Sequence, residues 1–182
     1  MQTILPKVSR NRTKRSRRSH QVAILWLALV ILLVFGCAPQ VISPPPETIT
    51  VTVYFTDTIR YATGGPPFEV AVRREVNSND NLPEAVLLEF FKGPTEEENA
   101  LGYEAITDGF TGFSALEISE GIARVYLTGI CFSNGATYTI AQPLMKNLLQ
   151  FKQVQYVKIF DQNGQTWEPD GPSNSIPACL EP

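Results

Sequence analysis

Histidine is almost absent from this 182-residue chain, and the single one, His20, lies in a basic leader. Without a histidine in its folded part, the chain has no Ser-His-Asp triad and no Cys-His pair. It also lacks an imidazole that could bind a metal or transfer protons near neutral pH. We therefore expect no metal site, no cofactor and no catalytic residues, and we expect that the protein is not an enzyme.

Acidic residues are missing from residues 1–36, which hold seven of the basic residues. Residues 37–182 hold 8 basic and 18 acidic residues, a net charge of −10. Nucleic-acid binding depends on cations that displace condensed counterions, so this surplus of acids predicts no nucleic-acid partner. The hydrophobic fraction of 43% is too high for a disordered chain.

A long hydrophobic run is also missing, because the uncharged stretch Val22–Gly36 has only fifteen residues. A membrane-spanning helix needs about 20, whereas the apolar region of a signal peptide is shorter. The run ends in Val34-Phe35-Gly36-Cys37, which resembles a bacterial lipobox. We predict a lipoprotein signal peptide at 1–36 and a lipid on Cys37, with an uncleaved N-terminal signal anchor as the alternative. Either reading places the acidic part outside the cytoplasmic membrane, since the positive end stays inside.

Proline is concentrated directly after Cys37, with three in a row at Pro44–Pro46. Consecutive prolines cannot join a helix or a central strand and favour the extended polyproline II conformation. Residues 37–47 are therefore predicted to form a semi-rigid stalk of roughly 30 Å that holds a folded domain away from the membrane.

Hydrophobic periodicity from residue 48 onward predicts alternating strands and helices. Strands are indicated by apolar residues at every second position, and helices by apolar stripes between capping and breaking residues. The predicted strands are 48–56, 68–76, 113–119, 122–128 and 154–160, and the predicted helices are 83–92, a short one after Thr95, and 139–150. This order predicts an α/β (α+β) fold: a small mixed sheet with two main helices packed on one face.

Several segments in this order resemble the GerMN domain, a family named from spore germination and sporulation proteins. They are Val51-Thr-Val-Tyr-Phe55, Leu88-Glu-Phe-Phe-Lys-Gly-Pro-Thr-Glu96, Glu120-Gly-Ile-Ala-Arg-Val125, Thr139-Ile-Ala141, Leu148-Leu-Gln-Phe151 and Val154-Gln-Tyr-Val-Lys-Ile159. The resemblance implies a small α/β domain at 48–164, similar to the ring-building modules of secretion and sporulation machinery, which act by protein–protein contact. It implies no catalytic residues.

The tail, residues 165–182, contains four prolines and would fray unless something held it. If Cys37 carries a lipid, Cys131 and Cys179 remain as a pair in an exported chain, where disulfides persist. We predict that a disulfide between them pins the tail. The alternative is two unpaired cysteines, one buried and one exposed.

Together these features predict a non-catalytic, membrane-anchored extracytoplasmic lipoprotein. Its GerMN-like domain would be a protein-interaction or scaffold module with a protein partner in the cell envelope. One alternative is a module that binds cell-wall glycan or a small ligand, with aromatic stacking faces offered by Tyr54, Tyr61, Tyr103, Tyr138 and Trp167. Another is a wall hydrolase that uses two carboxylates, for which Asp108 and Glu117 are candidates.

Overall fold

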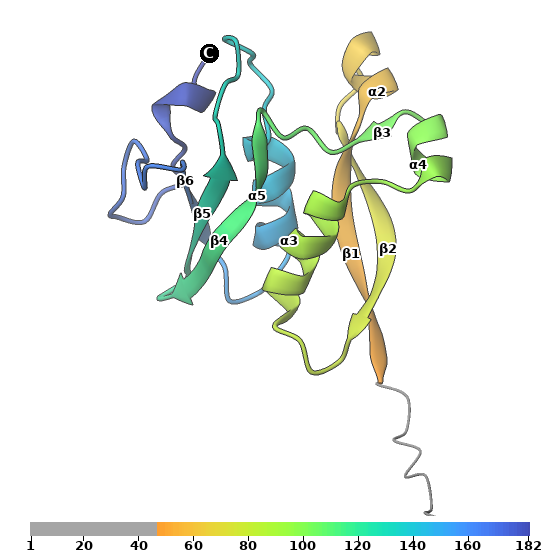
Figure 1. The fold of residues 1–182 in the computed structure, drawn as a ribbon, viewed down its shortest axis with the longest axis horizontal. Coiled ribbons are helices and arrows are strands. Elements are labelled where there is room, and N and C mark those ends of the chain that lie inside the picture. The colour runs from red at the N-terminus through yellow and green to blue at the C-terminus, as the bar shows by residue number, and fades with distance from the viewer. Residues whose placement is uncertain (1–46) are drawn as a thin grey trace, which may run out of the picture. The chain divides into compact units, whose positions relative to one another are not determined.

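Two small sheets enclose a pair of helices in the computed structural model, which describes residues 47–182 (Figure 1). The predicted signal peptide, the lipidation site Cys37 and all but the last residue of the predicted stalk lie outside the described residues. Within residues 47–182, no helix has the length and apolarity needed to cross a membrane.

The first sheet has the strand order β2-β1-β3 and is antiparallel throughout. β1 (Thr48–Asp57) pairs with β2 (Glu69–Asn77) over nearly its whole length, whereas β3 (Tyr103–Glu104) pairs only with the end of β1. The alternation predicted for the first strand is confirmed, because Val51, Val53 and Phe55 are buried. β1 therefore turns one face into the core.

A short helix that the sequence analysis did not predict, α2 (Thr58–Thr63), connects β1 to β2. Asp57 caps it by accepting a hydrogen bond from the Arg60 N–H, and Gly64 ends it in the left-handed conformation. A helix of this length has no apolar stripe that periodicity could detect, so only its two caps indicate it.

The second sheet has the strand order β4-β5-β6 and is mixed. β4 (Phe110–Ser119) and β5 (Ile122–Gly129) form the predicted antiparallel hairpin, turning at Glu120 and Gly121, which both have positive φ. β5 and β6 (Tyr156–Phe160) are parallel, and the chain between them contains α5 (Ala141–Leu149). A parallel pair needs such a crossover connection.

The two main helices, α3 (Leu82–Lys92) and α5, pack against both sheets (Figure 1). The predicted class of mixed α and β is confirmed, and each sheet has these helices on one face. The strands divide into two sheets rather than one because the helices lie between them and prevent β1 from meeting β4. The short α4 (Glu96–Ala100) follows α3 and has the predicted capping box between Thr95 and Glu98.

The tail packs onto the free edge of β6. Ser175 forms a parallel bridge with Lys158, donating its N–H to the Val157 carbonyl and accepting from the Ile159 N–H. The tail ends in a single turn of 3-10 helix, Ala178–Leu180, whose Leu180 is buried in the core. The structure joins Cys131 to Cys179 by a disulfide, the pairing that the sequence predicts.

Candidate functional site

A pocket of ≈ 250 Å³ lies where the tail meets the C-terminal part of the domain. Met145 of α5 contributes an apolar wall, and the chain after β6 contributes the rest. The lining residues are Met145, Trp167, Glu168, Asn174, Ser175, Ile176 and Glu181. Trp167 is the single residue among them that the sequence pattern marks as a candidate.

The buried hydroxyl of Ser175 organises the wall of this pocket. It accepts a hydrogen bond from the Glu168 N–H at 2.7 Å and lies 2.9 Å from the Thr166 hydroxyl. The Trp167 N–H donates to the Ile176 carbonyl at 3.0 Å. The two chain segments that carry the lining residues are therefore fixed against each other by hydrogen bonds.

A fully buried lysine is linked by hydrogen bonds to Glu168 of the pocket. The Lys158 ammonium group donates to the Asp170 carbonyl at 3.1 Å and to the Ser173 hydroxyl at 3.0 Å. Ser173 donates in turn to the Glu168 carboxylate at 2.5 Å. A serine beside a lysine can be a nucleophile and its base, but here both hydrogen bonds run from the lysine toward the glutamate. The trio links two opposite charges through a hydroxyl and orients Glu168.

The open side of the pocket combines an aromatic face with negative charge. The Trp167 side chain is 73% exposed and pairs with no other aromatic ring of residues 47–182. Within the same range, neither Glu168 nor Glu181 forms an ion pair. The pocket thus offers an unoccupied indole and two carboxylates to a ligand.

Two further apolar side chains are exposed on the loop that the disulfide links to the tail. Ile130 is 75% exposed and Phe132 is 56% exposed, on either side of Cys131. The loop is held by its N–H groups, which donate to the carbonyls of Asp108 and Gly109. A Cβ at Gly109 would lie 2.0 Å from the Ile130 carbonyl oxygen, so this close approach requires glycine. The loop and the C-terminus lie at the same end of the molecule (Figure 1).

The other aromatic candidates contact neighbouring side chains of the domain, although Tyr61 is itself 42% exposed. Tyr138 is buried, packs against Tyr61 with tilted rings and donates its hydroxyl to Glu69, and burial raises its pKa. The Lys146 ammonium group lies over the Tyr54 ring, 5.3 Å from its centre. Tyr103 packs against the core. Of the five aromatic candidates, Trp167 is the one that lines the pocket.

The two carboxylates proposed for a hydrolase are far apart. Asp108 precedes β4, accepts a 2.6 Å hydrogen bond from the Ile140 N–H and has its pKa raised by burial. Glu117 lies near the other end of β4, and seven residues of strand span about 23 Å. Paired glycosidase carboxylates lie about 5 to 10 Å apart. The structure does not bring these two together, and in residues 47–182 no group of three His, Cys, Asp or Glu residues is arranged to hold a metal ion.

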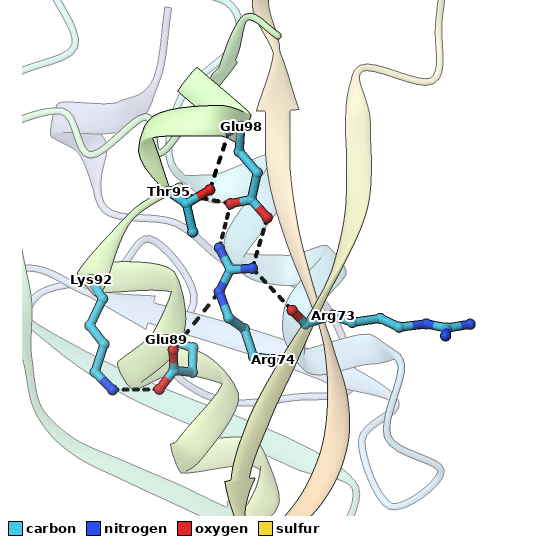
Figure 2. Close-up of polar contacts among 6 residues, drawn as sticks. All are labelled: Arg73, Arg74, Glu89, Lys92, Thr95 and Glu98. Carbon is cyan, nitrogen blue, oxygen red and sulfur yellow. Dashed lines mark hydrogen bonds and ion pairs between the residues drawn. The ribbon is translucent and has the colours of Figure 1, made fainter. Parts of the chain in front are cut away.

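A second charged cluster connects β2, α3 and α4 (Figure 2). The Arg74 guanidinium forms two hydrogen bonds with the Glu98 carboxylate, at 2.8 Å and 2.5 Å, and lies 4.0 Å from Glu89. Glu89 also pairs with Lys92, and Arg74 stacks on the buried Phe55 ring at 5.6 Å. Each charge in this cluster has a partner within it, so the cluster stabilises the packing of three elements.

Comparison with known proteins shows which family the domain resembles. Residues 52–167 match the family model described as Germane, sporulation and spore germination. Among solved structures, the chain is similar to the tandem GerMN domains of the sporulation protein GerM from Bacillus subtilis, at 15% identity and a TM-score of 0.47. That similarity covers 79% of this chain and 51% of the other, so this chain spans about half the length of that structure. Among curated proteins, none matches the sequence significantly.

The matched segment ends at Trp167, so most of the pocket lining comes from residues beyond it. The matched segment itself contains β2 to β6 and most of β1 and covers more than half of the chain. The protein therefore belongs to the Germane family of sporulation and spore germination domains.

Proposed function

We propose that this protein is a non-catalytic lipoprotein, anchored to the outer side of the cell membrane, whose Germane domain binds another envelope protein. Membership of a sporulation and germination family supports this role. The lipobox-like sequence that ends at Cys37 supports the anchor. The observation that carries the proposal is the exposure of three apolar side chains on the tail and on the loop that the disulfide joins to it: Ile130, Phe132 and Trp167.

The backbone segments that carry these three exposed side chains are held in place. The disulfide fixes the loop of Ile130 and Phe132 to the tail, and a backbone hydrogen bond fixes Trp167 to the same tail. Large apolar side chains that stay exposed on ordered segments mark candidate protein–protein contact sites, and tryptophan is enriched among the residues that dominate binding energy. We name these three residues the tail-end surface.

Cross-linking of intact cells, followed by immunoprecipitation of the full-length protein, tests the proposal. The variant carries Phe132→Ser and Trp167→Ala, and the control carries Leu101→Ser, because Leu101 is similarly exposed at 58% but follows α4. We expect the wild type and the control to capture the same envelope protein and the double variant to lose it. Equal capture by all three proteins would contradict the proposal.

One observation favours a second candidate, a module that binds cell-wall glycan. An exposed indole beside Asn174 and two carboxylates combines a stacking face with hydrogen-bonding groups, as sugar rings require. Retention of the full-length protein on purified wall polymer, lost in Trp167→Ala and without a protein partner, would favour this function. A wall-digestion assay on the same polymer tests the hydrolase alternative. That alternative requires the protein to lyse the wall and a single Asp or Glu substitution to abolish the lysis.

A further inference from the structure

We propose that the pocket of Trp167, Glu168 and Glu181 binds a cationic side chain, a lysine or an arginine, of the partner protein. The inference rests on the proposed interaction role and names the chemistry of the partner at this site. It combines three observations: the unpaired negative charge of the pocket, the free indole, and a volume suited to a single side chain.

The charge of the pocket favours a cation. Glu168 and Glu181 both line it, and within residues 47–182 no lysine or arginine forms an ion pair with either. The buried Lys158 reaches Glu168 only through Ser173, so one positive charge faces two negative ones. The exported part of the chain also carries a net charge of −10, which draws basic partners toward it.

The shape and the apolar lining favour a long basic side chain. The volume of ≈ 250 Å³ is below the about 300 Å³ at which pockets for whole small molecules begin. Met145 and Ile176 line the same pocket and can cover the methylene groups of lysine or arginine. The face of an indole attracts a cation more strongly than any other aromatic ring. A side chain with an apolar stem and a positive end matches each of these groups.

The site is also preorganised. Glu168 is held at its carboxylate by Ser173 and at its N–H by Ser175. Cys179, two residues before Glu181, is fixed by the disulfide to Cys131. The loops that carry these residues are therefore ordered before a ligand binds, which lowers the entropic cost of binding.

Tryptophan fluorescence of the full-length protein in detergent measures binding directly. The sequence has two tryptophans, Trp26 and Trp167, so Trp26→Phe leaves the pocket indole as the single emitter. The probe is the capped peptide acetyl-Lys-Lys-Lys-amide, and its control is the same peptide with acetylated lysine side chains. We expect a saturable change in emission with the first peptide and none with the second, and weaker binding in high salt.

Substitutions at carboxylates localise the effect. Glu181→Gln should weaken binding of the lysine peptide about fivefold, as the loss of a partly exposed ion pair does. Glu117→Gln, an exposed carboxylate on β4, should leave binding unchanged. A thermal melt of each variant verifies folding. Glu181→Gln should melt like the wild type, because the Glu181 carboxylate forms no hydrogen bond within residues 47–182.

Three results would overturn the inference: equal binding of both peptides, a response to chitotetraose instead of the lysine peptide, and no response to any probe. Immunoprecipitation distinguishes these from a failure of the proposed function. If Trp167→Ala still abolishes capture of an envelope protein, the interaction role stands without the cationic contact. If the Phe132→Ser, Trp167→Ala double variant also captures the partner as well as the wild type does, both proposals are wrong.

Discussion

At the scale of single residues, Asn147 shows how a helix side chain completes a sheet. It is fully buried in α5, and its amide accepts from the Tyr54 N–H and donates to the Tyr54 carbonyl, each at 2.8 Å. The pairing of β1 with β3 covers only Thr56 and Asp57, so the edge of β1 at Tyr54 has no neighbouring strand. Asn147 supplies the two hydrogen bonds that a strand would have made.

We predict that Asn147→Ala lowers the free energy of unfolding by about 2 to 4 kcal/mol, because it leaves the N–H and carbonyl of Tyr54 without partners. Urea denaturation followed by circular dichroism measures this loss. The control is Gln150→Ala, which removes hydrogen bonds to the Thr52 and Asn147 carbonyls but leaves the Asn147 side chain on Tyr54, and it should cost about 1 kcal/mol. Similar losses in the two variants would contradict a special role for Asn147.

The Arg74–Glu98 pair makes the stability of the domain depend on pH. The hydrogen bonds from the Arg74 guanidinium lower the pKa of Glu98 below its ordinary value of 4.5. A carboxylate whose pKa is lower in the folded state stabilises the fold above its unfolded pKa, and this contribution is lost as the pH falls through the folded pKa. The pair therefore stabilises the fold at neutral pH and loses its effect in acid.

We predict that Glu98→Gln lowers the free energy of unfolding at pH 7 by about 1 kcal/mol. The difference from the wild type should shrink as the pH falls below about 4.5. Denaturant titrations at pH 7, 5, 4 and 3 measure it. Glu97→Gln, in the same turn of α4 and without an ion pair in residues 47–182, is the matched control. A difference that stays constant with pH would show that the charge of Glu98 does not matter.

At the scale of elements, periodicity predicted the strands and helices that have a buried face. β1, the hairpin of β4 and β5, and α3 were all found near their expected ends, because burial of one face leaves a repeat in the sequence. α2 and β3 were missed, since a six-residue helix and a two-residue strand are too short to show one. Their positions depend on caps and on long-range pairing.

The pocket was predictable only at Trp167. Its polar residues lie in a proline-rich tail without periodicity: Glu168, Asn174, Ser175 and Glu181. They come together because Ser175 pairs with the edge of β6 and the disulfide fixes the last turn. The tail has no hydrophobic periodicity, so its contacts with β6 and with the loop of Cys131 leave no local signal in the sequence.

We predict that the Cys131–Cys179 disulfide holds the tail on β6 in the folded protein. The bond spans a sequence separation of 48, for which the chain-entropy model gives on the order of 4 kcal/mol. In a Cys131→Ser, Cys179→Ser variant, hydrogen exchange should speed up at the amides of Ser175 and Ile159, which bridge the tail and β6. Amides that pair β1 with β2 serve as the internal control.

Peptide mapping without reduction, on protein exported by its native host, identifies the bond itself. Two free thiols that react with an alkylating agent in the folded protein would contradict it. The tail end would then be held by the backbone pairing of Ser175 and the burial of Leu180 alone.

At the scale of the whole molecule, charge is divided sharply along the chain. Seven basic residues and no acid precede Cys37, while the remainder has a net charge of −10. A basic segment before a short apolar run keeps the first residues on the cytoplasmic side. In the proposed lipoprotein, the acidic domain would lie on the opposite side of the membrane, where the proposed basic partner surface would meet its pocket.

The same division leads to the prediction that Cys37 is the first residue of the mature protein and carries lipid. A diacylglyceryl group together with an amide-linked acyl chain provides the several chains that stable anchoring requires, since a single acyl chain binds membranes only marginally. Mass spectrometry of the N-terminal peptide measures the modification directly. In a Cys37→Ser variant, the leader should stay uncleaved and the lipid should be absent, whereas Cys131→Ser leaves both cleavage and lipid unchanged. A free Met1 or an unmodified Cys37 in the wild type would contradict the prediction and support an uncleaved anchor, which holds the domain at the membrane through residues 1–36.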